Sequence, residues 1–147
     1  MNVEGTVLVG PEFRPVEGRV VVEDGEIQAI EETETGSDSI VIPAFVNAHT
    51  HIGDSIAKEA GGGLSLDELV APPDGLKHRL LRNTDREMKV DAMARTVRQM
   101  EETGTASFIE FREGGVDGVA MLRDALERRQ VDPVILGRET EAAMDES

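Results

Sequence analysis

From Ile40 onward, the sequence alternates between short apolar segments and longer segments with apolar residues at helical spacing. Between these apolar segments, residues 88–100 and 116–129 have apolar side chains three and four positions apart, the pattern of an amphipathic helix. Strands that alternate with helices of this length are typical of βαβ units, whose parallel strands are buried on both faces. We therefore expect an α/β fold with right-handed crossovers. The expected strands are residues 40–46, 105–111 and 133–137.

The first forty residues predict a small antiparallel sheet instead. Residues 6–9 and 18–23 are β-branched runs, and residues 26–30 follow the second run after Asp24-Gly25. An Asp-Gly pair is a strong hairpin signal, because glycine accepts the positive φ of a type I′ turn. Residues 31–39 are polar and predict a loop. We expect a β segment over residues 1–42 and a second domain over residues 43–147.

The connection over residues 52–83 is long for a compact domain, and such loops are often lids or binding loops. Short helices are expected within it at residues 65–70 and 76–81. Thr84 and Glu87 have the spacing of a capping box, which predicts a helix that begins there and ends at Gly104. Residues 138–147 are expected to begin a third helical region.

The composition excludes several classes of protein. The 147 residues include 30 Asp and Glu against 15 Lys and Arg, spread along the whole chain, and no Cys. Nucleic-acid binding needs clustered cations, so we expect no nucleic-acid partner, and an anionic membrane surface is equally disfavoured. No run approaches the roughly 20 apolar residues of a membrane helix. We expect a soluble cytoplasmic protein, and the acidic surface is typical of halophilic proteins. Any metal must be bound by nitrogen and oxygen.

Two histidines two positions apart end the first of the expected parallel strands. Side chains i and i+2 of a strand point to one face, so His49 and His51 can converge on one ion at a Zn–N distance of about 2.0–2.1 Å. Thr50 should point the other way, into packing. Catalytic groups of α/β barrels lie at such strand ends. The alternative is a pair of polar residues that bind no metal.

Three further residues are candidate substrate contacts. Asn47 should share the face of the histidines and orient a ligand, or else make a strand-end hydrogen bond. If Ile109 and Phe111 face the helices, alternation turns Glu110 and Arg112 toward the mouth of a barrel, where they contact substrate or form a solvated ion pair. The third histidine, His78, is expected to be exposed. No catalytic acid or base can be assigned.

The segment Pro43-Ala44-Phe45-Val46-Asn47-Ala48-His49-Thr50-His51 resembles the end of the first barrel strand in the amidohydrolase superfamily, in particular its cytosine deaminase and chlorohydrolase-like branch. Ala44 stands where that pattern usually has glycine. Residues 18–30 resemble the small β-sandwich domain of the same enzymes. The resemblance extends to Gly137 only as an alternation of strands and helices.

This resemblance implies a (β/α)8 TIM-like barrel that holds one or two divalent metals, usually zinc, with His49 and His51 as ligands. The metal-bound water then attacks a non-peptide carbon–nitrogen bond in a small molecule: an amide, a cyclic amide or an amino-heterocycle. The chain would form the N-terminal part of the barrel, about three βα units, after the β-sandwich segment.

The remaining ligands of the family have no matching motif in this chain, and a full barrel takes about 250 residues. We therefore expect an incomplete active site and little activity from the chain alone. The alternative function is non-catalytic: a truncated chain, or one half of a split barrel completed by a partner chain or a second copy, since open strand edges favour association. A third reading is a small α/β binding domain whose histidine pair is incidental.

Overall fold

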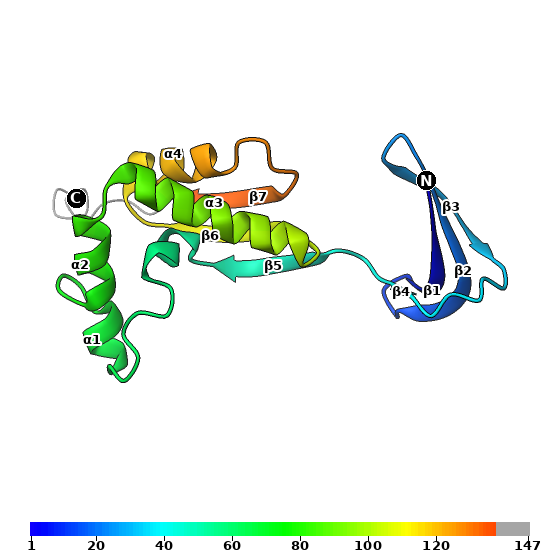
Figure 1. The fold of residues 1–147 in the computed structure, drawn as a ribbon, viewed down its shortest axis with the longest axis horizontal. Coiled ribbons are helices and arrows are strands. Elements are labelled where there is room, and N and C mark those ends of the chain that lie inside the picture. Colours follow the sequence, from blue (N-terminus) through cyan, green and yellow to red (C-terminus); the bar gives the residue numbers. More distant parts are fainter. Residues whose placement is uncertain (138–147) are drawn as a thin grey trace. The chain divides into compact units, whose positions relative to one another are not determined.

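The computed structural model describes residues 1–137, which form two compact units that divide after Ala44. The expected boundary was two residues earlier. Each unit has its own sheet, visible in Figure 1 as the blue strands of the first unit and the cyan-to-orange strands of the second. Residues expected to begin a third helical region, 138–147, lie outside the described residues.

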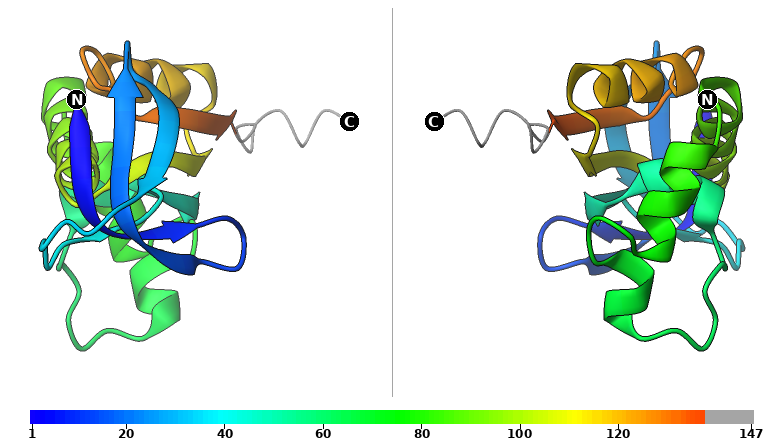
Figure 2. Two further views of the ribbon diagram at one scale, coloured as in Figure 1. Left: turned by 90° about the vertical axis from the view of Figure 1, so that its right-hand side faces the viewer. Right: turned by 90° about the vertical axis from the view of Figure 1, so that its left-hand side faces the viewer.

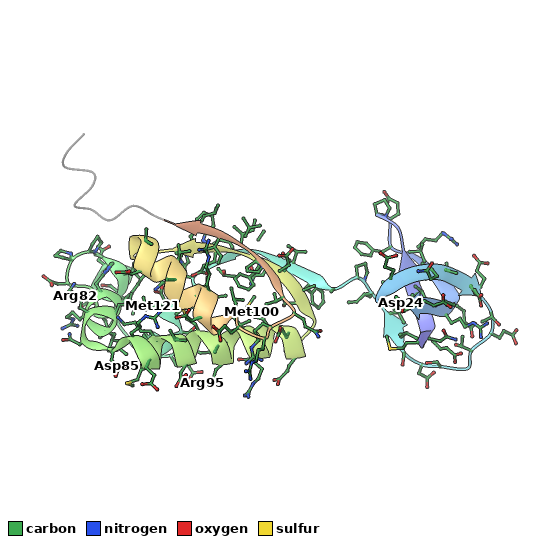
Figure 3. All side chains as sticks on the ribbon, turned by 90° about the horizontal axis from the view of Figure 1, so that it is seen from above. Asp24, Arg82, Asp85, Arg95, Met100 and Met121 are labelled. Carbon is green, nitrogen blue, oxygen red and sulfur yellow. The ribbon has the colours of Figure 1, made fainter. Side chains whose placement is uncertain are left out.

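The first unit is a four-stranded sheet in the order β3-β2-β1-β4. Asp24 and Gly25, at φ 50° and 82°, make the turn between β2 and β3, which confirms the predicted hairpin. Figure 3 labels Asp24 at this turn. Val7, Val16 and Val20 are the buried apolar side chains of the unit. The strands are β1 (Asn2–Val9), β2 (Arg14–Glu23), β3 (Glu26–Glu32) and β4 (Ile40–Val41).

The expected single strand over residues 40–46 is wrong. Ile40 and Val41 pair with β1 in the first sheet, whereas Phe45 begins β5 of the second sheet. Pro43 lies between them, and proline has no N–H for a sheet ladder. Phe45 and Val46 are 56% and 66% exposed, so the apolar run does not mark a strand buried on both faces.

The second unit contains a parallel three-stranded sheet in the order β5-β6-β7, as the alternating pattern predicts. Helices α3 and α4 lie on the same side of this sheet (Figure 2). The buried cluster beneath them is centred on Phe108, Met93, Val97 and Leu122, all 0% exposed. The elements are β5 (Phe45–Thr50), a 3₁₀ helix η1 (Ile52–Ala57), α1 (Leu66–Val70), α2 (Leu76–Asn83), α3 (Arg86–Glu102), β6 (Thr105–Arg112), α4 (Gly115–Ala125) and β7 (Asp132–Gly137).

Helices α3 and α4 are amphipathic: apolar side chains face the buried cluster, and polar side chains face solvent. Met100 of α3 and Met121 of α4 are partly buried against the cluster, whereas Arg95 of α3 is exposed; Figure 3 labels all three. The predicted capping box at Thr84 is wrong, because Asp85 is the N-cap and its side chain accepts from the Met88 N–H. The Thr84 hydroxyl donates instead to the Leu80 carbonyl.

Within the described residues, no helix is long and apolar enough to cross a membrane.

Candidate metal centre

The two histidines meet at the carboxyl end of β5. The Nε2 atoms of His49 and His51 are 3.1 Å apart, and both residues are exposed. Two nitrogens that bind one tetrahedral ion, each at about 2.0–2.1 Å, are separated by about 3.3 Å. The pair therefore fits two coordination positions of a zinc ion. Two neutral imidazoles can also share one proton across this distance, because one ring nitrogen donates and the other accepts.

Phe111 of β6 packs against both imidazoles. Its ring centroid is 4.7 Å from that of His49 and 6.2 Å from that of His51. An apolar ring beside the pair restricts the positions that the imidazoles can adopt. Sequence reasoning missed this residue because it assigned Phe111 to the helix-covered face.

The predicted facing of β6 is wrong. Phe108, Glu110 and Arg112 are the buried residues of this strand, at 0%, 0% and 4% exposure, so they face the helices. Alternation places Phe111 on the other face, with the histidines. Glu110 and Arg112 thus do not share the face of the histidine pair, which removes the basis for expecting them at the barrel mouth.

Thr50 points away from the histidines into packing, as expected. Its residue is 8% exposed, and its hydroxyl lies 2.9 Å from the Ile109 carbonyl oxygen and 2.6 Å from Glu110 Oε2. The Asn47 side-chain oxygen accepts a hydrogen bond of 3.3 Å from the His49 N–H. This contact is the strand-end hydrogen bond that was the alternative for Asn47. The pairing of β5 with β6 has a register shift between Asn47 and Thr50.

A lysine from α2 joins two acids beside the strand ends. Lys77 Nζ lies 3.0 Å from Asp54 Oδ2 in η1 and 2.9 Å from Glu113 Oε1, directly after β6. Burial alone would lower the pKa of Lys77, but the hydrogen bonds to Glu113 and Asp54 outweigh it and raise this pKa above its ordinary value of 10.5. The ammonium group is therefore held charged, and it ties the 52–83 connection to β6.

Replacing Lys77 by Met should destabilise the second unit by about 1–2 kcal/mol at pH 7, because the ion pairs of Lys77 with two partly buried carboxylates are lost. A group whose pKa is raised on folding stabilises the fold fully below its unfolded pKa and loses this contribution as pH rises through the folded value. The difference between wild type and Lys77→Met should therefore be constant up to about pH 10 and shrink above it. Urea unfolding from pH 7 to 11 measures this, and an equal difference at every pH contradicts it.

Lys58→Met is the matched control for this experiment. Lys58 is exposed, and its Nζ donates to Gln99 Oε1 at 3.3 Å. Its replacement should change the free energy of unfolding by less than about 0.5 kcal/mol.

Residues 1–137 contain no group of three His, Cys, Asp or Glu side chains placed to hold a metal ion. The expectation that His78 is exposed is wrong: this residue is partly buried in α2, and its Nε2 lies 3.0 Å from the Val70 carbonyl oxygen. Asp54 is held by Lys77. The described residues therefore offer His49 and His51 as a pair of ligands, one fewer than the three protein ligands usual for catalytic zinc.

Comparisons with known proteins agree with this architecture. The chain is 42% identical over 142 residues to a protein of Methanothermobacter thermautotrophicus named "Putative aminohydrolase", covering 92% of this chain and 37% of that protein. It is 37% identical over 145 residues to an uncharacterized protein of Methanocaldococcus jannaschii, covering 95% of this chain and 38% of the other. The chain thus spans little more than a third of the length of these relatives.

Solved structures of similar fold include a guanine deaminase and an atrazine chlorohydrolase. A guanine deaminase of C. acetobutylicum with bound guanine matches with a TM-score of 0.60 at 14% identity, over 91% of this chain and 35% of that one. An atrazine chlorohydrolase of Arthrobacter aurescens complexed with zinc matches with a TM-score of 0.63 at 13% identity. This match covers 92% of this chain and 35% of the chlorohydrolase chain. The model of the amidohydrolase family matches residues 40–145, more than half of the chain. Together with the archaeal relatives, this match establishes that the chain belongs to the amidohydrolase family.

Proposed function

We propose that this chain forms the N-terminal part of a metal-dependent hydrolase that cleaves non-peptide carbon–nitrogen bonds in small molecules. The observation that carries the proposal is the 3.1 Å approach of His49 and His51 Nε2 at the end of a parallel strand. The family match supports the reaction class, and the zinc-containing chlorohydrolase supports the choice of metal. Substrates of the proposed class are an amide, a cyclic amide or an amino-heterocycle.

In this proposal, His49 and His51 supply two imidazole nitrogens to one divalent ion, preferably zinc. A bound zinc lowers the pKa of its water toward 7 and supplies hydroxide at neutral pH. Phe111 excludes solvent from one side of the two rings, and the Asn47 side chain holds the backbone of His49. The remaining ligands and the acid or base that protonates the leaving amine are assigned to parts of the barrel outside the described residues.

The proposal predicts that the chain binds about one zinc ion and that either His49→Ala or His51→Ala weakens binding at least tenfold, about 1.4 kcal/mol. The reason is that each substitution removes one of two ligands. Zinc titration by calorimetry in a buffer without competing chelators measures the affinity. His78→Ala is the control and should bind zinc as the wild type does, because His78 contacts Val70. Absence of binding, or binding that survives both substitutions, refutes the metal site.

A second candidate function is supported by the open face of the parallel sheet. Apolar residues of both edge strands are exposed. Val134 and Leu136 of β7 are 52% and 43% exposed, and Phe45 and Val46 of β5 are 56% and 66% exposed. Among the described strands, β5 and β7 each pair on one side alone. Exposed edges and apolar faces favour association. In this candidate, the chain is one half of a split barrel, and a partner chain or second copy supplies the missing strands. Coding sequence after Ser147 with further His and Asp motifs would favour one longer enzyme instead.

A further inference from the structure

Glu110 is a fully buried carboxylate that the proposed metal centre does not use. Glu110 is 0% exposed, and it lies on the face of β6 opposite to the histidine pair. Burying such a group is costly unless hydrogen bonds compensate it. The partners of this side chain therefore indicate what it does.

The Glu110 side chain contacts backbone N–H groups in the segment that follows His49. Its Oε2 accepts from the Ile52 N–H at 2.8 Å, and its Oε1 accepts from the Gly53 N–H at 3.2 Å. Oε2 also lies 2.6 Å from the Thr50 hydroxyl. These three residues flank His51 on both sides. A single side chain from the neighbouring strand thus contacts the Thr50 side chain before this histidine and two backbone N–H groups after it.

We infer that Glu110 is a positioning residue for the metal centre: it holds the turn at residues 50–53 so that the His51 imidazole stays within reach of His49. This inference rests on the proposed function. It adds to that function a reason why the pair can bind an ion. The two imidazoles are exposed, and without a fixed turn they would lose side-chain and backbone conformational entropy on binding. A turn that is fixed before binding lowers this cost.

Neutral glutamine cannot replace this carboxylate. Both oxygens of Glu110 face a backbone N–H, whereas glutamine has one oxygen and one donor amide. In Glu110→Gln, either Ile52 or Gly53 therefore faces an NH₂ group instead of an acceptor. The variant keeps the volume of the side chain but loses at least one of the two backbone contacts.

The chain offers a matched control in Glu101. Its Oε1 also accepts from two consecutive backbone N–H groups, those of Gln130 at 2.6 Å and Val131 at 3.2 Å. These contacts hold the connection before β7 and not the histidine segment. In Glu101→Gln the remaining oxygen can keep both N–H groups, but Arg129, whose Nη1 lies 3.5 Å from Oε2, loses its carboxylate partner. This variant should therefore cost stability without affecting the histidine pair.

The test combines zinc affinity with two measurements on the metal-free protein. Zinc alone is titrated into wild type, Glu110→Gln and Glu101→Gln. We expect about a tenfold loss of zinc affinity in Glu110→Gln, as for other residues that orient metal ligands, and no loss in Glu101→Gln. Without metal, Glu110→Gln should show faster hydrogen exchange at Ile52 and Gly53 and a weaker nuclear Overhauser effect between the His49 and His51 rings.

Equal zinc affinity in Glu110→Gln and Glu101→Gln overturns the inference, even where wild type binds zinc and the proposed function stands. If wild type binds no zinc, the proposed function fails, and the ring-to-ring Overhauser effect alone decides whether Glu110 positions His51. If Glu110→Gln does not fold, Thr50→Val replaces it, because this variant removes one contact of Glu110 and preserves the shape of the side chain. A loss of at least about threefold in zinc affinity is expected there, and unchanged affinity overturns the inference.

Discussion

Replacing Phe108 by Ala should destabilise the second unit by about 3–5 kcal/mol, because the removed ring leaves a cavity in a close-packed core. Phe108 is 0% exposed and lies in the buried cluster with Met93, Val97 and Leu122. Urea unfolding followed by far-UV circular dichroism measures the change. Within the described residues, every helix belongs to the second unit, so the helical signal reports that unit.

Phe45→Ala is the control for the cavity. Phe45 lies in the same unit and loses the same number of atoms, but this residue is 56% exposed. We expect a change below about 1 kcal/mol for this variant, in proportion to the smaller apolar area that it buries. Similar losses for both variants would mean that Phe108 is not the centre of the core.

Gly53→Ala should be the second large effect, a destabilisation of about 1–3 kcal/mol from overpacking. A Cβ atom at this position would lie 2.5 Å from Cζ of Arg112 and closer still to Nη1. Arg112 cannot move away freely, because it is 4% exposed and its Nε donates to the Gly118 carbonyl at 3.1 Å. The substitution therefore also strains the turn that follows His51.

Gly62→Ala provides the comparison. Nothing lies within 4 Å of a Cβ built at Gly62, and its φ is not in the left-handed region. Its replacement should be neutral or slightly stabilising, because alanine restricts the unfolded chain. Thermal unfolding of both variants measures the contrast, and a Gly53→Ala protein as stable as wild type would show that Arg112 has room to move.

Local patterns in the sequence predicted the elements whose causes are themselves local. The Asp24-Gly25 turn, the helix that ends before Gly104 and the parallel order of the later strands all follow from residues close in sequence. The boundary between the sheets was harder, since residues 40–46 are uniformly apolar and Pro43 alone marks the break.

The candidate site was predictable only in part for the same reason. His49 and His51 are two residues apart, so the geometry of one strand brings them together. Alternation in β6 allows two facings, and the apolar character of Ile109 and Phe111 favoured the wrong one. Deciding between them requires the contacts of Glu110 with residues 50–53, almost 60 positions away. The spacing of residues in a single sequence does not reveal such long-range contacts.

The central claim is that His49 and His51 together bind a divalent metal, and X-ray absorption at the zinc edge tests it most directly. Zinc-loaded wild type should show two imidazole nitrogens at about 2.0–2.1 Å, with the outer-shell scattering of the rings. This imidazole signal should disappear in the His49→Ala/His51→Ala double variant and persist in His78→Ala. Zinc surrounded by oxygen alone in wild type, or an imidazole signal retained in the double variant, would contradict the account.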